Sequence, residues 1–383
     1  MAIQEKPDAK LAAALDPVVD AALAEGRLAG GVVLVAKDGV LAYARAAGQA
    51  DLETGRPMTR DAIFRASSLT KPIVTAAVLA LVEDGVVGLD DPVIRYLPDF
   101  QPKWQGEPLT ITLRQLLTHT AGLSYGFMQP GDGPYLQLGV SDGMDQPGLG
   151  FADNLKRIAN AGLFFPPGAA WLYSVGIDVL GAAVEEATGK SLGDVVRERV
   201  TGKLGMNDTG FSVSDKARLA RPYADGPPPK PMGATHTVPF AELSGIKFAP
   251  DRIFTPGSFP SGGAGMACSA PDFLTFLEAI RSGGGGVVGA DTASAMMTNQ
   301  TGSHAIVTSG PGWGFGFGGA VMLDPTASGS PLPAGAWMWG GVYGHSWFVD
   351  PAGKKSVVLM TNTSTEGMSG RLSQELFAAA AAH

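Results

Sequence analysis

The stretch that decides the fold reads Phe64-Arg65-Ala66-Ser67-Ser68-Leu69-Thr70-Lys71-Pro72-Ile73-Val74. Apolar residues continue from there almost without interruption to Gly85, which predicts a buried helix. Proline is tolerated only within or just past a first helical turn, so Pro72 places the helix start near Ser67 or Ser68. Residues three apart share a helix face, and the Ser68 hydroxyl and Lys71 amine are therefore expected side by side.

Such a pair places a nucleophile beside a base. A serine hydroxyl is a weak nucleophile until a neighbouring group takes its proton, and a lysine does this when its surroundings lower its pKa. Free backbone N–H groups at a helix start are also available to a developing anion. The hypothesis that follows is a serine hydrolase working by acyl transfer.

Competing serine motifs occur elsewhere in the chain. A second Ser-x-x-Lys, formed by Ser244 and Lys247, opens no apolar helix and is set aside. The nucleophile-elbow pattern Gly-x-Ser-x-Gly occurs around Ser124, Ser141 and Ser191. None of these serines follows a β-branched strand and opens a helix, as an elbow requires. We interpret all three as chance matches in a chain with 53 glycines.

Both ends of the chain predict a helix beside antiparallel strands. Residues 9–25 place apolar side chains at helical spacing, and the apolar runs 31–36 and 40–44 flank a Lys-Asp-Gly turn. Towards the other end, two strand-like runs within 346–361 precede a helical pattern over 372–382. These patterns favour an α/β (α+β) fold, an antiparallel sheet flanked by terminal helices.

The middle of the chain is expected to be an insertion. Residues 1–80 and 261–383 would form the α/β lobe, and residues 81–260 a mainly helical inserted lobe with long loops. Helix starts in the insertion are marked by the capping patterns Thr112-x-x-Gln115 and Ser191-x-x-Asp194.

Composition narrows the class of protein. A chain of 383 residues with 45% hydrophobic and 17% charged residues is typical of an ordered globular enzyme. The net charge of −8 gives no electrostatic footprint for nucleic acid. The five histidines show no metal-ligand spacing, so neither a metal nor a cofactor is expected.

The expected location is the cytoplasm. The single Cys268 excludes an intrachain disulfide and fits a reducing compartment. The polar start of the chain does not resemble a signal peptide, and no run of 18 apolar residues predicts a membrane span. Nothing in the sequence indicates an oligomeric state.

Six blocks of sequence add a family resemblance. They are Ser68-Leu69-Thr70-Lys71 and the residues 116–123, 167–174, 204–211, 261–265 and 339–344. Together they resemble the serine β-lactamase-like superfamily of class C type, and most closely the family VIII carboxylesterases. The resemblance covers roughly residues 15–380. It implies an α/β lobe packed against a helical lobe, an active site between them, and a small-molecule ester as substrate.

The resemblance also implies roles for individual residues. Ser68 would be the acylated nucleophile, and Lys71 and Tyr173 would share the proton transfers, with the sequence not deciding which is the base. The backbone N–H groups of Ser68 and Val342 would form the oxyanion hole. The residues Trp339, Gly340 and Gly341 would lie on an edge strand lining the cleft, and His345, shortly after them, would contact the substrate.

Two departures from penicillin-recognising relatives favour an esterase. Those relatives usually carry Lys or His where this chain has Trp339, and class C β-lactamases have Tyr-x-Asn where this chain has Tyr173-Ser174-Val175. Both changes indicate neutral, rather hydrophobic esters with short to medium acyl chains. Six aromatic residues are expected to supply an apolar wall: Trp313, Phe315, Phe317, Trp337, Tyr343 and Trp347.

Other functions remain open at this point. Weak β-lactam hydrolysis is compatible with the same acylation machinery. Alternatives to an esterase are a β-lactamase or D-alanyl-D-alanine peptidase, an acyltransferase that passes the acyl group to an alcohol, and a non-catalytic relative that binds ligands. His119 falls late in a predicted helix, where histidine is usually a cap or a packing residue, so no Ser-His-Asp triad is predicted.

Overall fold

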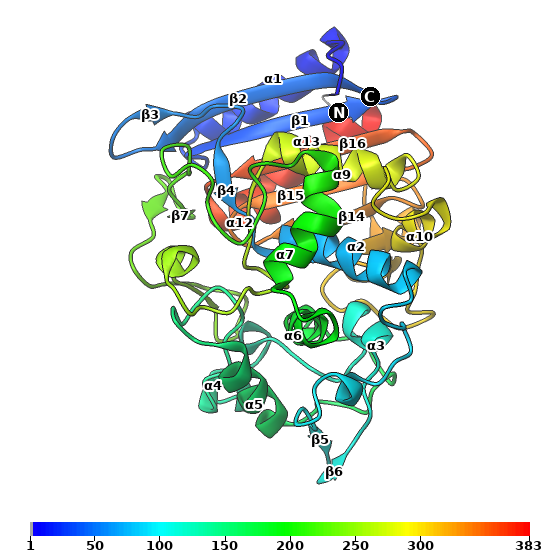
Figure 1. Cartoon of the computed structure of the whole chain (residues 1–383). Coiled ribbons are helices and arrows are strands. Elements are labelled where there is room, and N and C mark those ends of the chain that lie inside the picture. The colour runs from blue at the N-terminus through cyan, green and yellow to red at the C-terminus, as the bar shows by residue number, and fades with distance from the viewer. Residues whose placement is uncertain (1–2) are drawn as a thin grey trace.

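The computed structural model describes residues 3–383, and its largest element is an eight-stranded sheet. The strand order is β12-β13-β14-β15-β16-β1-β2-β3, and all neighbours are antiparallel (Figure 1). Its strands are β1 (Gly30–Lys37), β2 (Val40–Asp51), β3 (Arg56–Pro57), β12 (Trp313–Phe315), β13 (Ala320–Met322), β14 (Trp337–Gly341), β15 (His345–Asp350) and β16 (Lys355–Thr361).

Strands from opposite ends of the chain pair at the junction of β1 and β16 within the sheet. β1 and β2 form a hairpin whose turn residues Asp38 and Gly39 have φ of 54° and 80°, conformations that suit the Asp-Gly pair. The other edge of β1 pairs with β16, where Val33 faces Leu359. The predicted α/β fold with one shared antiparallel sheet is therefore confirmed.

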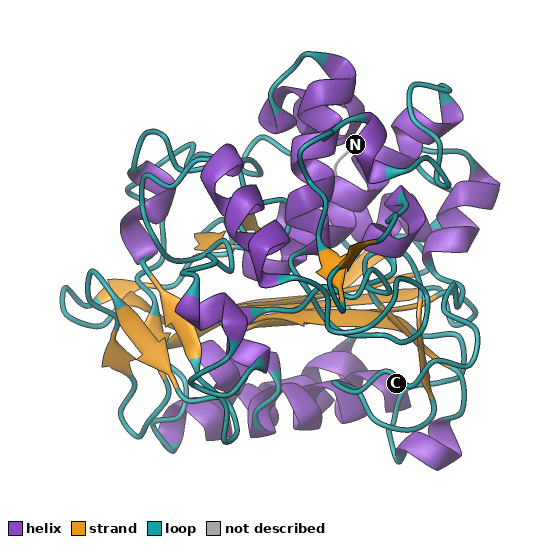
Figure 2. Cartoon of the chain, turned by 90° about the horizontal axis from the view of Figure 1, so that it is seen from below, coloured by secondary structure: helices purple, strands orange, loops and turns teal. Residues whose placement is uncertain are grey.

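Helices cover both faces of the sheet (Figure 2). Successive side chains of a strand point to opposite faces, and β1 divides its residues accordingly. Val33 and Val35 pack under the terminal helices α1 (Ala9–Ala24) and α13 (Arg371–Ala382). Val32 and Leu34 join the core on the other face, where α9 (Ala270–Arg281) and α2 (Thr70–Glu83) lie.

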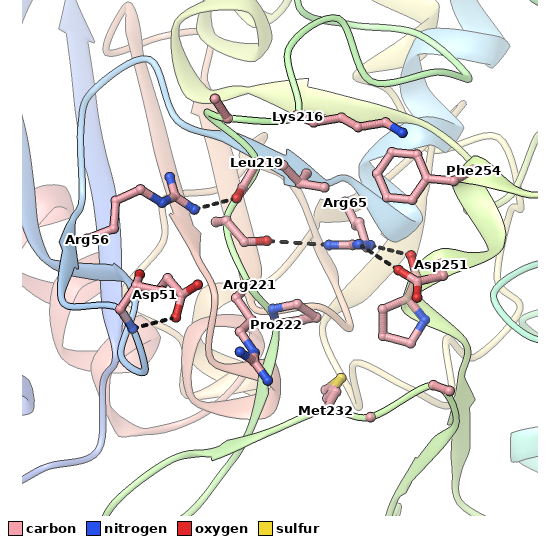
Figure 3. Close-up of a pocket in the computed structure, with 16 residues that line it drawn as sticks. Asp51, Arg56, Arg65, Lys216, Leu219, Arg221, Pro222, Met232, Asp251 and Phe254 are labelled. Atoms are coloured by element: carbon pink, nitrogen blue, oxygen red, sulfur yellow. Dashed lines mark hydrogen bonds and ion pairs between the residues drawn. The ribbon is translucent and has the colours of Figure 1, made fainter.

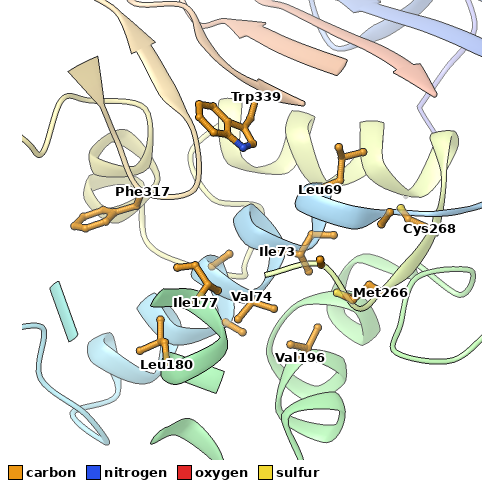
Figure 4. Close-up of a cluster of buried hydrophobic side chains, with 14 of the residues drawn as sticks. Leu69, Ile73, Val74, Ile177, Leu180, Val196, Met266, Cys268, Phe317 and Trp339 are labelled. Atoms are coloured by element: carbon orange, nitrogen blue, oxygen red, sulfur yellow. The ribbon is translucent and has the colours of Figure 1, made fainter. Parts of the chain in front are cut away.

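Helix α2 runs through the middle of the larger core (Figure 4). Every residue from Thr70 to Leu81 is buried, as expected for a helix that is apolar all round. Ile73 and Val74 pack near Ile177 and Leu180 of α6 (Gly176–Thr188) (Figure 4). Burying one such side chain contributes about 1.5–3 kcal/mol, so α2 is firmly held.

The remaining elements are short. The helices are α3 (Leu113–Leu117), α4 (Pro134–Gln137), α5 (Phe151–Ala161), α7 (Leu192–Val196), α8 (Gly202–Leu204), α10 (Ala290–Met296), α11 (Pro325–Ser328) and α12 (Ser364–Met368). The two-stranded pairs are β4 (Ile63–Arg65) with β11 (Ala267–Ser269), β5 (Lys103–Trp104) with β6 (Glu107–Pro108), β7 (Tyr223–Ala224) with β8 (Lys230–Pro231), and β9 (His236–Val238) with β10 (Ile246–Phe248).

We propose that the two predicted lobes correspond to the sheet with its covering helices and to the segment that carries helices α3 to α8 (Figure 1). The proposed boundary at residue 80 falls inside α2, which ends at Glu83. It therefore belongs in the loop after that helix. Within residues 3–383, no helix has the length and apolar character needed to cross a bilayer.

Strand β14 departs from the sequence-based expectation. The strand as a whole lies between β13 and β15 and is not an edge strand, but the predicted residues 339–341 have no partner in β13. The pairing with β13 is limited to Trp337 and Met338, whereas β15 pairs along all of β14. The segment 339–341 thus extends past β13, towards the start of α2.

Candidate active site

Ser68 occupies a tight turn at the start of the central helix. The turn is a short 3-10 segment, Ser67–Leu69, and the α-helix itself begins at Thr70. Ser67 has φ of 44°, a left-handed conformation that is costly for a residue other than glycine and that clusters at functional sites. The predicted helix start is therefore correct to within one turn.

Strand β14 is seated directly against this turn. A Cβ atom on Gly341 would lie 2.5 Å from Ser67 Oγ and 2.8 Å from the Ala66 carbonyl oxygen. The backbone N–H of Tyr343 donates to Ser67 Oγ over 3.4 Å. Only glycine at position 341 allows this approach, so the role of Gly341 is to let the strand and the serine turn pack together.

Lys71 lies beside the serine, as its spacing predicts. Its Nζ donates to Ser68 Oγ over 3.2 Å and to the Gly263 carbonyl oxygen over 2.8 Å. The side chain is only 1% exposed, and Nζ lies 4.6 Å from the centre of the Tyr173 ring. A buried amine that donates to two acceptors beside an aromatic face has a fixed position.

Tyr173 completes the cluster. Its Oη donates to Ser68 Oγ over 2.8 Å and accepts a hydrogen bond from Trp339 Nε1 over 3.0 Å. All four side chains, of Ser68, Lys71, Tyr173 and Trp339, are buried. The structure thus brings together four of the residues singled out in the sequence.

His119 packs against the Tyr173 ring. Its ring lies 4.9 Å from the Tyr173 ring in an edge-to-face arrangement, and Nδ1 lies 3.1 Å from Ser174 Oγ. Burial, and then the positive charge of Lys71, hold the pKa of His119 well below its usual value. A neutral, buried imidazole agrees with the interpretation as a packing residue.

Residues 261–265 belong to the family resemblance, but nothing in the sequence indicates that Gly263 in this loop holds Lys71. Gly263, whose carbonyl accepts from Lys71, is anchored through Asp178 on α6. Asp178 Oδ1 accepts hydrogen bonds from Ser261 Oγ over 2.5 Å and from the Gly263 N–H over 3.3 Å. Burial raises the pKa of this carboxyl group. A backbone acceptor such as the Gly263 carbonyl has no signature in sequence.

A cavity of about 230 Å³ opens above Ser68. Ser68, Tyr173, Trp339, Gly340 and Val342 line it, as expected from the sequence. Its apolar walls come from residues that the sequence did not indicate: Phe127, Met128, Phe240, Met338 and Met368. None of the described residues that line this cavity is charged.

The predicted aromatic wall is wrong. None of the six aromatic residues proposed for it lines the cavity described above. Trp337 and Trp347 are completely buried and pack against each other with ring centres 4.6 Å apart. Phe315 lies behind Trp339, at 5.3 Å between ring centres. These rings fill the core beneath the sheet because helices cover that face.

The prediction that His345 contacts the substrate is also wrong. The residue is fully buried, does not line the cavity, and its Nε2 donates to the Arg65 carbonyl oxygen over 2.8 Å. Its ring lies against Phe64 at 5.6 Å, and burial lowers its pKa to about 4. His345 therefore links β15 to β4 through this hydrogen bond and lies outside the cavity.

The three elbow-like serines lie outside the cavity. Ser124 Oγ donates to the carbonyl oxygen of Tyr125, and Ser141 Oγ donates to Asp145 over 2.5 Å. Ser191 caps α7 through the Asp194 N–H, as the capping pattern predicts. Within residues 3–383, no group of His, Cys, Asp and Glu is arranged to hold a metal ion.

A buried Ser–Lys–Tyr cluster at the start of a central helix, beside an antiparallel sheet, defines a class of active-site serine hydrolases. The family profile named Beta-lactamase matches residues 15–382. The chain belongs to this family, and the predicted fold and the predicted class, a serine hydrolase of the β-lactamase-like superfamily, are confirmed.

Individual relatives refine this assignment. The chain is 51% identical over 369 residues to Esterase EstB of Burkholderia gladioli, covering 95% of this chain and 93% of the esterase. The solved structure of EstCE1, described as a hydrolase with promiscuous acyltransferase activity, has a TM-score of 0.92 at 44% identity, over 97% of this chain and 98% of EstCE1. A penicillin-binding protein from Bacillus halodurans shares the fold, with a TM-score of 0.68 at 20% identity over 95% of this chain and 98% of its own.

Proposed function

We propose that the protein is a carboxylesterase that hydrolyses neutral esters with short to medium acyl chains through an acyl-enzyme at Ser68. One observation carries the proposal. Ser68 Oγ lies 3.2 Å from Lys71 Nζ and 2.8 Å from Tyr173 Oη, at one wall of a cavity without charged residues. The 51% identity to an esterase supports the same activity.

Acylation begins with attack of Ser68 Oγ on the ester carbonyl carbon. The hydroxyl proton passes to the member of the Lys71–Tyr173 pair that is unprotonated, as a free amine or a phenolate, and both groups lie within hydrogen-bond distance of Oγ. The carbon–oxygen bond to the alcohol then breaks, and the alcohol leaves with the proton that the pair held.

The negative charge of the tetrahedral intermediate needs backbone donors. Ser68 and Val342 both line the cavity, and we propose that their N–H groups form the oxyanion hole. In serine hydrolases one such donor contributes about 3–4 kcal/mol to transition-state stabilisation. The close packing of Gly341 on the serine turn sets the distance between the two donors.

Deacylation repeats the same proton transfers with water. A water molecule gives a proton to the Lys71–Tyr173 pair while its oxygen attacks the acyl carbon. The bond to Ser68 Oγ breaks, Oγ regains the proton, and the carboxylic acid leaves. The pair thus acts first as base and then as acid in each half of the reaction.

The lining of the cavity selects the substrate. At position 339 an indole stands instead of a cation, so a carboxylate on the substrate finds no counter-charge there. Apolar walls and a volume of about 230 Å³, below the usual range for drug-sized ligands, favour small uncharged acyl groups. A β-lactam, with its carboxylate, would be a poorer substrate.

A fluorophosphonate probe tests the nucleophile. We expect a label on the tryptic peptide beginning at Ala66, and no label on the Ser68→Ala variant. Failure to label, or a label on Ser124, Ser141 or Ser191, would refute the mechanism. Rates on p-nitrophenyl acetate, butyrate and octanoate, measured beside nitrocefin, test the substrate class. A clear preference for nitrocefin would contradict our interpretation of Trp339.

Acyl transfer to alcohols is a second candidate activity. The apolar residues around Ser68 would shelter an acyl-enzyme from water and admit an alcohol, and EstCE1, at 44% identity, is described as having promiscuous acyltransferase activity. With vinyl butyrate and n-butanol in buffer, we expect butyl butyrate alongside butyric acid. Butyric acid as the only product would exclude this activity.

The same proposal includes membership of the family VIII carboxylesterases, catalysis by the Ser-x-x-Lys motif and a location in the cytoplasm. Cys268 is fully buried, and burial raises the pKa of its thiol, so it is an inert packing residue. Fractionation of the native host with an antibody to this protein tests the location, and activity in the secreted fraction would contradict it.

A further inference from the structure

A second, larger hollow lies apart from Ser68. It has a volume of about 740 Å³, and its walls come from β3, β4, the loop 216–222, residues 232–234 and the turn 250–254. Ser68 is not among the residues that line it. Four cationic side chains from separate segments converge on it, namely Arg56, Arg65, Lys216 and Arg221 (Figure 3).

Arg65 is the most confined of the four. Its side chain is 10% exposed, Nε donates to the Pro250 carbonyl oxygen over 2.6 Å, and Nη1 donates to the Ala220 carbonyl oxygen over 3.3 Å. A guanidinium has five N–H donors, so three remain after these two bonds. The carboxylate nearest to it, of Asp251, is 4.0 Å away and itself 78% exposed.

Arg65 thus has one carboxylate partner, Asp251, at the 4.0 Å limit of an ion pair and largely exposed to solvent. Burial lowers the pKa of Arg65, and a desolvated cation is costly unless it is paired. The two backbone acceptors fix the guanidinium in one orientation at the wall of the hollow, with Asp251 beside it (Figure 3). The Arg65 guanidinium is therefore preorganised to bind an anion.

The neighbouring cations are available as well. Among residues 3–383, neither Arg56 nor Lys216 has a carboxylate within 4.0 Å. Arg56 Nη2 donates to the Leu219 carbonyl oxygen over 2.6 Å, and Lys216 Nζ lies 4.4 Å from the centre of the Phe254 ring.

The acidic residues nearby are already engaged. Asp51 accepts the backbone N–H groups of Glu53 and Thr54, and Glu53 pairs with Arg221 at 3.2 Å. Four cationic side chains and the two carboxylates of Asp51 and Asp251 line the hollow, which therefore keeps an excess of positive charge.

We propose that this hollow binds a small organic carboxylate. A carboxylate matches the planar fork of the Arg65 guanidinium, with Arg56 and Lys216 adding to the attraction. The apolar body of the ligand would lie against Phe254 and Met232, which also line the hollow. This site is independent of the chemistry proposed for Ser68.

A titration with 4-fluorobenzoate, followed by ¹⁹F NMR on the full chain, tests the site. We expect saturable binding that weakens at high salt, and much weaker binding of the uncharged 4-fluorobenzyl alcohol. Absence of saturable binding would overturn the proposal. Inorganic phosphate binding as tightly as 4-fluorobenzoate would also overturn it, because the apolar side of the hollow would then have no role.

Variants locate the binding. The double variant Arg56→Gln/Lys216→Ala changes side chains at the rim and should weaken 4-fluorobenzoate binding about tenfold or more, since it removes two charged contacts. Arg95→Gln and Lys190→Ala, whose side chains do not line the hollow, should leave binding unchanged. Circular dichroism confirms folding of each variant. Unchanged binding by the folded double variant would place the ligand elsewhere and refute the site.

Discussion

The indole Nε1–H of Trp339 donates a hydrogen bond to Tyr173 Oη over 3.0 Å, and the same phenol oxygen lies 2.8 Å from Ser68 Oγ. Trp339 therefore acts on the nucleophile through the tyrosine, in addition to forming a wall of the cavity. An indole N–H can donate but cannot accept, so it occupies one lone pair of the phenol oxygen and leaves the phenol O–H to donate to Ser68 Oγ.

Replacing Trp339 with phenylalanine should separate these two roles. Trp339→Phe keeps an aromatic ring against Phe315 but removes the N–H donor. We expect kcat to fall about tenfold, with little change in Tm, because one hydrogen bond to a reacting group is lost. Trp337→Phe is a matched control on the same strand, since Trp337 Nε1 has no hydrogen-bond partner among residues 3–383. Equal activity of the two variants would contradict the role of Trp339.

The proton-transfer pair predicts large losses of turnover. Lys71→Ala and Tyr173→Phe each remove a group within hydrogen-bond distance of Ser68 Oγ. We expect kcat on p-nitrophenyl butyrate to fall about a hundredfold or more in each variant. Tyr96→Phe, at the protein surface near Asp91, serves as the control. Near-normal turnover of either active-site variant would remove that residue from the mechanism.

Gly341 should tolerate no side chain. A Cβ at this position would lie 2.5 Å from Ser67 Oγ and 2.8 Å from the Ala66 carbonyl oxygen, so the strand or the serine turn must move. We expect Gly341→Ala to lower the free energy of unfolding by about 1–3 kcal/mol and to reduce kcat strongly. Urea unfolding and steady-state rates measure both effects.

The control for this variant is Gly131→Ala, because a Cβ at position 131 would meet no atom within 4 Å. If Gly341→Ala is as stable and as active as Gly131→Ala, the packing of β14 on the serine turn is not what positions the site.

The acyl-chain preference should respond to Phe240. This ring lines the cavity and packs edge-to-face on Phe127, with ring centres 5.6 Å apart. Phe240→Ala enlarges the cavity without removing a charged or hydrogen-bonding group. We expect the ratio of kcat/KM for octanoate to acetate esters to rise about tenfold, as apolar chain is buried in the new space. A ratio unchanged from wild type would show that the acyl chain lies elsewhere.

His345 predicts a dependence of stability on pH. Its buried imidazole has a pKa of about 4, whereas an unfolded histidine has a pKa near 6.5. Between these values the unfolded chain binds the additional proton, so the free energy of unfolding falls as the pH is lowered from 6.5 towards 4. The full contribution of this group is about 3 kcal/mol.

The variant His345→Gln keeps a donor for the Arg65 carbonyl oxygen but does not titrate in this range. Its Tm should therefore fall less than that of the wild type between pH 7.5 and 4.5. Parallel pH profiles of the two proteins would show that His345 is accessible to protons in the folded state.

Local chemistry explains which features could be predicted from sequence. The hairpin turn at Asp38-Gly39 and the capping box of Thr112 and Gln115 depend only on neighbouring residues, and both are present in the structure. The Ser68–Lys71 contact follows from helical spacing in the same way. Tyr173 and Trp339, distant in sequence, were placed near Ser68 only through the family resemblance.

The features that sequence could not supply depend on long-range packing. Phe127 lies in a single 3-10 turn and Phe240 in a loop, and nothing in their sequence neighbourhood indicates that they meet above Ser68. The expectation of an edge strand at 339–341 came from the family resemblance, and the neighbouring β13 has only three residues, too few for a recognisable pattern. The hydrogen bond that Lys71 donates to Gly263 is accepted by a backbone carbonyl, a group that every residue possesses.

The pairing of β1 with β16 has a consequence for synthesis of the protein. The partner strand of β1 emerges from the ribosome about three hundred residues later, which at ordinary translation rates takes on the order of tens of seconds. Throughout that interval the apolar helix α2 has no completed sheet to cover it. We therefore expect the nascent chain to bind chaperones during this interval. Slower translation at low temperature should lengthen the period in which the chain depends on them.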